Sequence, residues 1–318
     1  MNIGIIGTFW LSETFARAVQ RLEGVRVAAV CSRSMDKAMA FANTIACGAA
    51  CYDDPAQLAC DSAVDAVYIA TPNVTHYTLS KQMLQAGKHV LCEKPVCVEL
   101  WQYEELLALA NERGLVYLEA MMNAHLPRLE SLKKALSASG AIISARLDFS
   151  QRSSKIDRVR QGEVFSTFSK AACGGALMDL GVYSVYMALQ LFGYPSWVEA
   201  YATQICDVDG TDTVILGYDS YQVVLTMSKL AESKIRSEIL CENGTIELGL
   251  LSRLQELYHY PTGGEAECLF GTSDFEESMT WEISDFASYV KGKDYTKMQQ
   301  LSRDSIRLLN AIKAKTGL

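Results

Sequence analysis

The chain has no surplus of positive charge. Its 318 residues include 29 Lys and Arg against 37 Asp and Glu, which gives a net charge of -8. Acidic and basic residues are mixed along the chain, so no basic tail or stripe is present to attract phosphates. Because nucleic acids and anionic membranes attract basic proteins, we expect neither of them as a partner.

Paired cysteine motifs are missing as well. There are ten cysteines but no C-x-x-C pair, and their neighbours are apolar, as in Val30-Cys31 and Leu91-Cys92. Such thiols are typical of a reduced, packed core. Cys47 and Cys51 have a spacing that some metal sites use, yet no histidine or second cysteine pair lies near them. We therefore expect no metal site and a cytoplasmic protein.

Targeting and membrane segments are not evident either. No basic segment precedes an apolar run near the start, so no secretory signal is expected. The longest uncharged stretch, Leu180–Val198, contains glycine, glutamine and proline, which favours a buried helix and a turn over a membrane span. The length allows two domains, each with its own core.

The first 120 residues alternate between short apolar strands and amphipathic helices. The expected strands are Asn2–Ile6, Val25–Cys31, Val64–Ala70, Lys88–Leu91 and Leu115–Leu118. The expected helices are Ser12–Leu22, Met35–Ile45, Val74–Ala86 and Glu99–Glu112. Glycine follows three of these helices, where a left-handed end is least costly for that residue. This α/β pattern predicts a parallel sheet with right-handed crossovers.

Residues 121–318 follow a different pattern and form the expected second domain, of α+β type. A helix (Leu129–Ser137), a strand (Ile142–Phe149), a polar loop (Gln151–Ser169) and an apolar helix (Ala176–Phe192) come first. Strands are then expected at Val198–Ile205, Thr213–Tyr218, Gln222–Ser228, Lys234–Cys241 and Thr245–Leu248, separated by turn dipeptides at Asp209-Gly210, Asp219-Ser220 and Asn243-Gly244. They predict an open, mainly antiparallel sheet. Two helices, Ser273–Val290 and Lys297–Ala314, end the chain, and we expect the last one to pack back on the first domain.

The turn after the first strand contains part of a phosphate-binding motif. A helix N-terminus presents unbonded N–H groups to a pyrophosphate, and glycines let the backbone approach it. Gly7 and Thr8 fit this motif, but Phe9 stands where a second glycine is usual. By itself, this turn is equally compatible with a plain connection between strand and helix.

The end of the second strand bears on the choice of cofactor. An NAD site usually has an acidic residue there, whereas this chain has Ser32 and Arg33. A hydroxyl and a guanidinium suit a 2′-phosphate, so NADP is favoured over NAD. The alternative is that Arg33 is solvated and that Ser34 only caps the next helix.

Two further strand ends carry polar turns with proline. Ala70–Asn73 and Cys92–Pro95 fall at the carboxyl edge of the expected sheet, where open α/β folds bind ligands. Lys94-Pro95 is also a candidate cis peptide, because only an X-Pro bond adopts that form at small cost.

One apolar helix carries an isolated acid. Asp179 is the one charged residue between Ala176 and Tyr194, and Tyr183 follows it by four residues on the same helical face. A buried carboxylate requires a partner. Spacing alone leaves open a structural aspartate beside a core tyrosine.

Together these motifs resemble the Gfo/Idh/MocA oxidoreductases, in the branch of trans-dihydrodiol dehydrogenase-like proteins. The glycine turn, A-T-P-N-x-x-H at Ala70–His76, A-G-K-H-V-L-x-E-K-P at Ala86–Pro95 and G-G-A-L-M-D-L-G-V-Y at Gly174–Tyr183 occur in the family's order. The resemblance covers essentially the whole chain. It implies a Rossmann dinucleotide-binding domain over 1–120 and a substrate-binding and oligomerisation domain over 121–318. It also implies a homodimer, or a tetramer, built through the C-terminal sheet.

The resemblance also implies the site residues. The catalytic positions are Lys94, Asp179 and Tyr183. The expected cofactor-binding residues are Gly7, Thr8, Phe9, Trp10, Ser32, Arg33, Thr71, Pro72, Asn73, His76, Glu93, Lys94 and Asn123. Many relatives have histidine where Tyr183 stands, and an aromatic-arginine pair where this chain has Asn123-Ala124. His125 is a substitute for that pair, or else a capping or core histidine.

The chemistry of these residues agrees with hydride transfer. Oxidation of an alcohol needs a base for the hydroxyl proton, and a tyrosine with a pKa near 10 is a poor base at neutral pH. A nearby ammonium, Lys94, would lower this pKa, and Asp179 would orient the substrate and keep Lys94 charged. We therefore expect an NADP- or NAD-dependent oxidoreductase acting on a carbohydrate, polyol or cyclic diol. The alternatives are a dinucleotide-binding regulator without turnover and a glycosidase that uses tightly held NAD.

Overall fold

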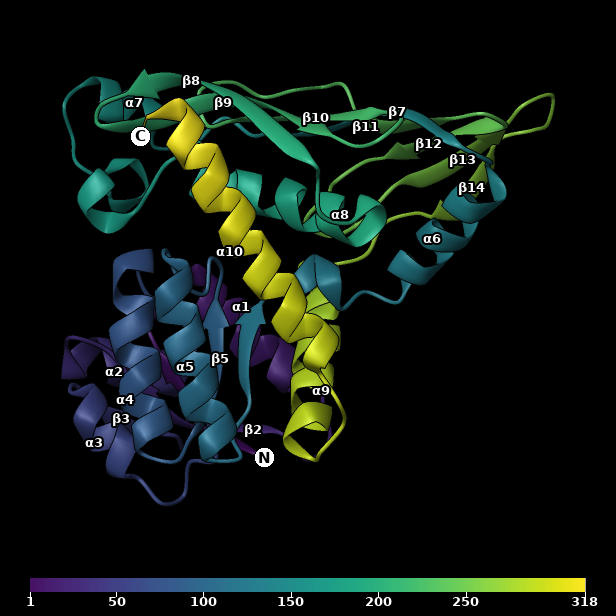
Figure 1. The fold of residues 1–318 in the computed structure, drawn as a ribbon. Helices are drawn as coiled ribbons and strands as arrows, with labels where there is room; N and C mark the ends of the chain where they lie inside the picture. Colours follow the sequence, from purple (N-terminus) through teal and green to yellow (C-terminus); the bar gives the residue numbers. More distant parts are fainter. Residues whose placement is uncertain (318) are drawn as a thin grey trace. The chain divides into compact units, whose positions relative to one another are not determined.

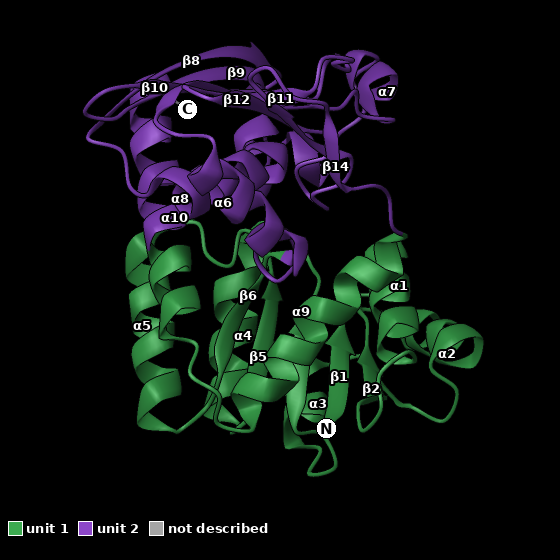
Figure 2. Ribbon diagram, turned by 90° about the vertical axis from the view of Figure 1, so that its right-hand side faces the viewer, with its two compact units in different colours: residues 1–121, 274–303 green, residues 122–273, 304–318 purple. Residues whose placement is uncertain are grey.

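The computed structural model describes residues 1–317, and the chain divides into two compact units. Unit 1 contains residues 1–121 and 274–303, and unit 2 contains residues 122–273 and the chain from Asp304 onward (Figure 2). The expected domain boundary at residue 120 falls beside the end of the first segment of unit 1. Residues 274–303, which we assigned to the second domain from the sequence, belong to unit 1.

Unit 1 is built on a six-stranded parallel sheet with the strand order β3-β2-β1-β4-β5-β6. Its strands are β1 (Asn2–Ile6), β2 (Arg26–Cys31), β3 (Ala50–Tyr52), β4 (Ala66–Ile69), β5 (His89–Glu93) and β6 (Tyr117–Ala120). Its helices are α1 (Trp10–Val19), α2 (Met35–Ile45), α3 (Pro55–Cys60), α4 (His76–Gln85), α5 (Leu100–Glu112) and α9 (Phe275–Val290). This strand order is that of a Rossmann fold, which confirms the expected class.

Most of the expected elements of unit 1 are present. The glycines after three of the helices, Gly24, Gly87 and Gly114, have φ values of 73°, 79° and 65°, as left-handed helix ends require. The pair β3 and α3 was not expected, because three and six residues are too few to show a hydrophobic period.

Gly7 joins three strands at the centre of this sheet. Its N–H donates to the carbonyl of Cys31 at 2.9 Å, and its φ is 107°. A Cβ added to it would lie 1.9 Å from the carbonyl oxygen of Ala70, just beyond β4. Only glycine permits this approach, so the turn after β1 is fixed by packing as well as by backbone conformation.

Unit 2 contains an eight-stranded sheet with the order β14-β13-β12-β11-β7-β10-β9-β8. The strands are β7 (Ile142–Ser150), β8 (Trp197–Ile205), β9 (Val208–Gly217), β10 (Gln222–Ser228), β11 (Ser237–Cys241), β12 (Gly244–Leu248), β13 (Leu257–Pro261) and β14 (Glu267–Phe270). All pairs are antiparallel except β7 with β10, so the sheet is mixed and mainly antiparallel, as predicted. The last two strands were not expected.

The helices of unit 2 lie largely to one side of this sheet (Figure 1). They are α6 (Arg128–Ala138), α7 (Ile156–Arg160), α8 (Val182–Phe192) and the end of α10 (Thr296–Thr316), which begins in unit 1. The short α7 lies within the segment expected as a loop. By length and composition Lys170–Phe192 could cross a membrane, but 67% of its most apolar window is buried, as in a core helix.

The dipeptide Asp209-Gly210 does not form the turn that we expected from the sequence. It lies inside β9, and the chain turns before it, at Cys206, whose φ is 55°. A Cβ on Gly210 would lie 2.9 Å from side-chain atoms of Ile205 and Leu230. The glycine therefore serves close packing rather than a change of direction.

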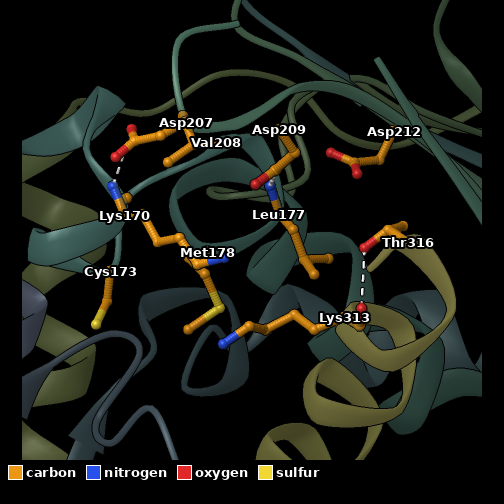
Figure 3. Close-up of a pocket in the computed structure, with 11 residues that line it drawn as sticks. Lys170, Cys173, Leu177, Met178, Asp207, Val208, Asp209, Asp212, Lys313 and Thr316 are labelled. Carbon is orange, nitrogen blue, oxygen red and sulfur yellow. Dashed lines mark hydrogen bonds between the residues drawn. The ribbon is translucent and has the colours of Figure 1, made fainter. Parts of the chain in front are cut away.

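Asp209 instead fixes the start of the helix that carries Asp179. The N–H of Leu177 donates to its carboxylate at 2.5 Å (Figure 3). A Cβ on Gly175, which has a φ of 117°, would lie 2.0 Å from the same carboxylate. This contact explains the second glycine of the Gly-Gly motif. The helix begins as a π-helical turn, Leu177–Gly181, before α8, and such turns are frequent at functional sites.

A second buried acid, Asp212, faces Asp209. The carboxyl of Asp212 points toward Asp209 (Figure 3) and is 1% exposed. Burial, together with the charge of Asp209, raises the pKa of Asp212 to about 9. Asp212 therefore carries its proton at neutral pH.

Substitution of Gly7 tests the close approach of β1 and β4. Gly7→Ala and Gly24→Ala both introduce a side chain at positive φ, a conformation that costs about 1–2 kcal/mol. Only Gly7→Ala also meets a backbone carbonyl, since nothing lies within 4 Å of a Cβ on Gly24. In urea denaturation, we expect Gly7→Ala to lower the free energy of unfolding by about 1–3 kcal/mol more than Gly24→Ala does. Equal losses would contradict the packing account.

Substitution of Asp212 tests the raised pKa of its carboxyl. The folded pKa lies above the unfolded value, so this group lowers stability progressively as pH rises from about 4 to about 9, by up to about 1.4 kcal/mol per pH unit. In Asp212→Asn an amide replaces the neutral acid and cannot ionise. The difference between the melting temperatures of Asp212→Asn and the wild type should therefore increase, in favour of the variant, as pH rises across this window. A constant difference would show that Asp212 is already ionised.

Candidate functional site

Each unit contains a group of candidate functional residues. In unit 1 it lies at the carboxyl ends of β1, β2, β4 and β5. The strand order reverses between β1 and β4, and a doubly wound sheet binds dinucleotides at this point. In unit 2 it lies on the helical segment that contains Asp179 and Tyr183. Each part is described separately below.

Phe9 lies at the surface of the glycine turn. It precedes α1 in an extended conformation and is 42% exposed. Its ring meets Trp10 edge to face at 6.4 Å, and Trp10 meets Phe275 at 5.7 Å. Because phenylalanine has no side-chain acceptor, it cannot cap the helix. The first N–H groups of α1 are therefore not satisfied by their N-cap residue, as an anion-binding terminus requires.

The end of β2 is tied to this turn. The hydroxyls of Thr8 and Ser32 are 3.1 Å apart, and the N–H of Ser32 donates to the carbonyl of Tyr52. Arg33 is exposed. Ser34 holds the N-cap position of α2, but its side chain makes no capping hydrogen bond with the described part of the chain. The part of the alternative in which Ser34 caps α2 therefore has no support here, whereas the exposed Arg33 fits both a solvated side chain and a phosphate-binding one.

His76 connects the two proline-bearing turns. Its Nδ1 lies 2.9 Å from the carbonyl of Pro95, and its Nε2 lies 2.9 Å from the carbonyl of Thr71. The ring is fully buried, and burial, reinforced by the charge of Lys94, lowers its pKa against the opposing effect of the two hydrogen bonds. The structure thus places His76 behind the turns, where it holds them together and does not face solvent.

The first of these turns is also braced internally. The hydroxyl of Thr75 lies 2.7 Å from that of Thr71 and donates to the carbonyl of Pro72 at 2.7 Å. Pro72 is exposed and Asn73 is half-buried. Pro72 and Asn73 are therefore presented at the strand edge on a fixed backbone.

The second turn has a buried acid beside it. Glu93 accepts a hydrogen bond from the hydroxyl of Tyr68 at 2.6 Å and another from the N–H of Lys94 at 3.2 Å. The Lys94-Pro95 peptide is cis, as predicted. Glu282, on α9, is 1% exposed, and burial, with the charges of Glu93 and Glu119, raises its pKa well above the ordinary value. Burial therefore favours the protonated form of Glu282.

In unit 2, Asp179 has a partner that the motifs do not indicate. Its Oδ2 accepts a hydrogen bond from the ammonium of Lys229 at 2.7 Å. The ring of Tyr183 is half-buried and meets the ring of Phe149, on β7, edge to face at 5.4 Å. The acid and the phenol are therefore held by different elements of the sheet.

Asn123 lies in the core of unit 2. It is fully buried, and its Nδ2 lies 3.3 Å from the carbonyls of both Tyr183 and Leu251, to which it donates. These hydrogen bonds brace the backbone of Tyr183, and the cofactor-binding role expected of Asn123 stays a prediction. His125 is also buried.

Two site residues escaped the sequence motifs. Glu282 is aligned with Met279 and Phe286 on the apolar face of its helix, so an acid in a buried row could have been noticed. Lys229 directly follows an alternating strand, which is a weak signal. Among residues 1–317, no three His, Cys, Asp or Glu side chains are arranged to hold a metal ion.

Comparisons with known proteins identify the family of this chain. A family model described as an oxidoreductase family with an NAD-binding Rossmann fold matches residues 1–121, and the GFO/IDH/MocA C-terminal domain matches residues 133–247. The scyllo-inositol 2-dehydrogenase (NADP(+)) IolU of Bacillus subtilis (strain 168) is 35% identical over 292 residues, which cover 92% of this chain and 88% of that protein.

More distant relatives extend the comparison. The trans-1,2-dihydrobenzene-1,2-diol dehydrogenase of Homo sapiens is 31% identical over 222 residues, 68% of this chain and 64% of that protein. The crystal structure of KijD10, a 3-ketoreductase from Actinomadura kijaniata in complex with NADP and TDP-benzene, has a TM-score of 0.87 at 23% identity and covers 99% of this chain and 98% of that one. At that identity it supports the fold alone.

The strand order, the motifs and the two matched domains lead to one conclusion. The chain belongs to the Gfo/Idh/MocA family and is an NAD(P)-dependent dehydrogenase, as its motifs predict.

Proposed function

We propose that this protein uses NADP to interconvert a hydroxyl and a carbonyl group on a sugar, a polyol or a cyclic diol. The observation that carries the proposal is the presence of Asp179 and Tyr183 on one helical segment of a chain that also contains the Glu93–Pro95 turn. The relative that acts on scyllo-inositol, as its name states, supports a polyol as the first substrate to test.

The residues of unit 1 fit a dinucleotide. The N-terminus of α1, whose N-cap residue makes no side-chain hydrogen bond, suits a pyrophosphate, and Ser32 and Arg33 suit a 2′-phosphate. We assign Thr71, Pro72, Asn73 and Glu93 to the ribose and nicotinamide end, with Thr8, Phe9 and Trp10 beside the phosphates. The bound nicotinamide supplies the hydride acceptor or donor.

Tyr183 exchanges the proton in this proposal. Lowering the pKa of a phenol by about two units requires a preference of roughly 2.7 kcal/mol for the phenolate. One ammonium about 4 Å away provides about 4 kcal/mol at an intermediate dielectric, and Lys94 is assigned that role. Asp179 orients the substrate hydroxyl. In the reverse direction Tyr183 protonates the carbonyl oxygen.

The assembly and the compartment complete the proposal. On the unit 2 sheet, Tyr201 of β8 is 68% exposed, and the residues aligned with it, Thr213 and Thr226, are partly exposed. An uncovered sheet face of this kind suits a homodimer, or a tetramer built from two such dimers. All ten cysteines are free thiols, which suits the reducing cytoplasm.

Removal of the phenol hydroxyl tests the proton-transfer role. In Tyr183→Phe we expect turnover of scyllo-inositol with NADP⁺, followed by absorbance of NADPH, to fall by at least about 100-fold. Binding of NADPH should change little in calorimetry. Tyr221→Phe, which keeps the stacked pair with Tyr218, is the matched control. Equal loss of turnover and cofactor binding would contradict the assignment.

Removal of the guanidinium tests the cofactor preference. Arg33→Ala should weaken NADPH binding about 10- to 100-fold, the value of a charge-assisted hydrogen bond, and leave NADH binding unchanged. Arg113→Ala, an exposed arginine bonded to the carbonyl of Gln85, is the control. If the ratio of the two affinities stays the same in Arg33→Ala, Arg33 does not read the phosphate.

A further inference from the structure

Lys229 is a buried lysine whose ammonium has a complete set of contacts. Its side chain is 3% exposed. The ammonium donates to Asp179 Oδ2 at 2.7 Å and to the carbonyl of Thr167 at 2.9 Å, and it lies 4.5 Å from the centre of the Phe168 ring. An ammonium so deeply buried is stable only when such partners replace water.

The backbone holds Lys229 in place on both sides. Its N–H donates to the carbonyl of Gly210 at 2.8 Å, and its carbonyl accepts from the N–H of Ser153 at 2.9 Å. The side chain therefore starts from a fixed point next to β9. The lysine contributes a rigid positive charge rather than a mobile surface one.

Other acids nearby have partners of their own. Asp209, next to Gly210, accepts the hydrogen bond from Leu177, and the carboxyl of Asp212 faces Asp209. Asp207 accepts from the N–H of Lys170. Phe168, whose ring lies next to the Lys229 ammonium, is apolar and carries no charge. The carboxylate that pairs with the Lys229 ammonium is therefore that of Asp179.

We propose that Lys229 is a positioning residue that fixes the carboxylate of Asp179 in one orientation and keeps it ionised for the substrate hydroxyl. The claim about ionisation and orientation concerns unit 2 alone. The claim about the substrate rests on the proposed function. Two readouts separate them.

The first readout needs no substrate. In protein labelled with ¹³C at the aspartate carboxyls, the Asp179 signal is assigned by its loss in Asp179→Asn. Lys229→Met removes the charge and keeps an unbranched side chain. We expect the titration midpoint of Asp179 to rise by about 1–3 pH units in Lys229→Met. Lys234→Met, which removes an exposed lysine bonded to Glu232, should leave it unchanged.

The second readout is the pH profile of kcat/KM for oxidation of scyllo-inositol by NADP⁺. In Lys229→Met, the pKa that defines the acid limb of this profile should rise by as much as the titration midpoint of Asp179 does. It should return toward the wild-type position in Lys229→Arg, which restores the charge. Once Asp179→Asn is present, Lys229→Met should reduce kcat/KM by less than about twofold further, because the two residues act as a unit.

The outcomes are distinct. An unchanged Asp179 midpoint in folded Lys229→Met overturns the proposal, whatever the activity. A full further loss in the double variant also overturns it, because Lys229 would then act independently of Asp179. Absence of turnover in the wild type refutes only the choice of substrate in the proposed function, and the carboxyl titration still decides the role of Lys229.

Discussion

The start of β9 determines where the chemistry of unit 2 is held. Asp209 bonds the first turn of the helix that carries Asp179 and Tyr183, and the carbonyl of its neighbour Gly210 bonds the backbone of Lys229. Two adjacent residues thus fix both members of the Lys229–Asp179 ion pair. The cost is a second buried acid, Asp212, whose pKa is raised to about 9 by burial and by Asp209. Removal of one member of such a network leaves the others without partners, so the network favours a single arrangement.

In unit 1, a buried histidine fixes the backbone of the turns that carry the assigned residues. His76 lies beneath two turns that come from different strands, and its two ring nitrogens face the carbonyls of Thr71 and Pro95. The polar residues of these turns thereby lie on a rigid backbone at the sheet edge. Glu282 adds a further buried acid to this unit, and burial together with the charge of Glu93 raises its pKa well above the ordinary value. In both units, buried polar groups orient the residues assigned to the chemistry.

The sequence predicted the fold well where the hydrophobic period was long. The strand Asn2–Ile6 and the helix Met35–Ile45 have the bounds expected of them, whereas β3, α3, β13 and β14 are too short or too polar to be recognised. The prediction of a turn at Asp209-Gly210 was wrong. A glycine after an aspartate suits either a turn or close packing, and only the packing of Ile205 and Leu230 against Gly210 shows which applies. Local composition alone could not decide between these uses.

The candidate site was predictable in its motifs and less so in its supports. The turns at Thr71 and Glu93 lie at the expected edge of the sheet, but the buried roles of His76 and Asn123 depend on contacts across the fold. Lys229 contacts Asp179 across 50 residues of chain, a pairing that no local pattern encodes. Supporting residues of this kind become visible only when the strand order is known.

The central claim, that Lys94 makes the phenol of Tyr183 a usable base, has a direct test. The ultraviolet absorbance of tyrosinate, taken as the difference between wild type and Tyr183→Phe with NADP⁺ present, reports the ionisation of this one residue. The account predicts a midpoint near pH 8, about two units below the ordinary value, and a rise of more than about one unit in Lys94→Met. A midpoint at or above 10 in the wild type, or one unchanged by Lys94→Met, would contradict it.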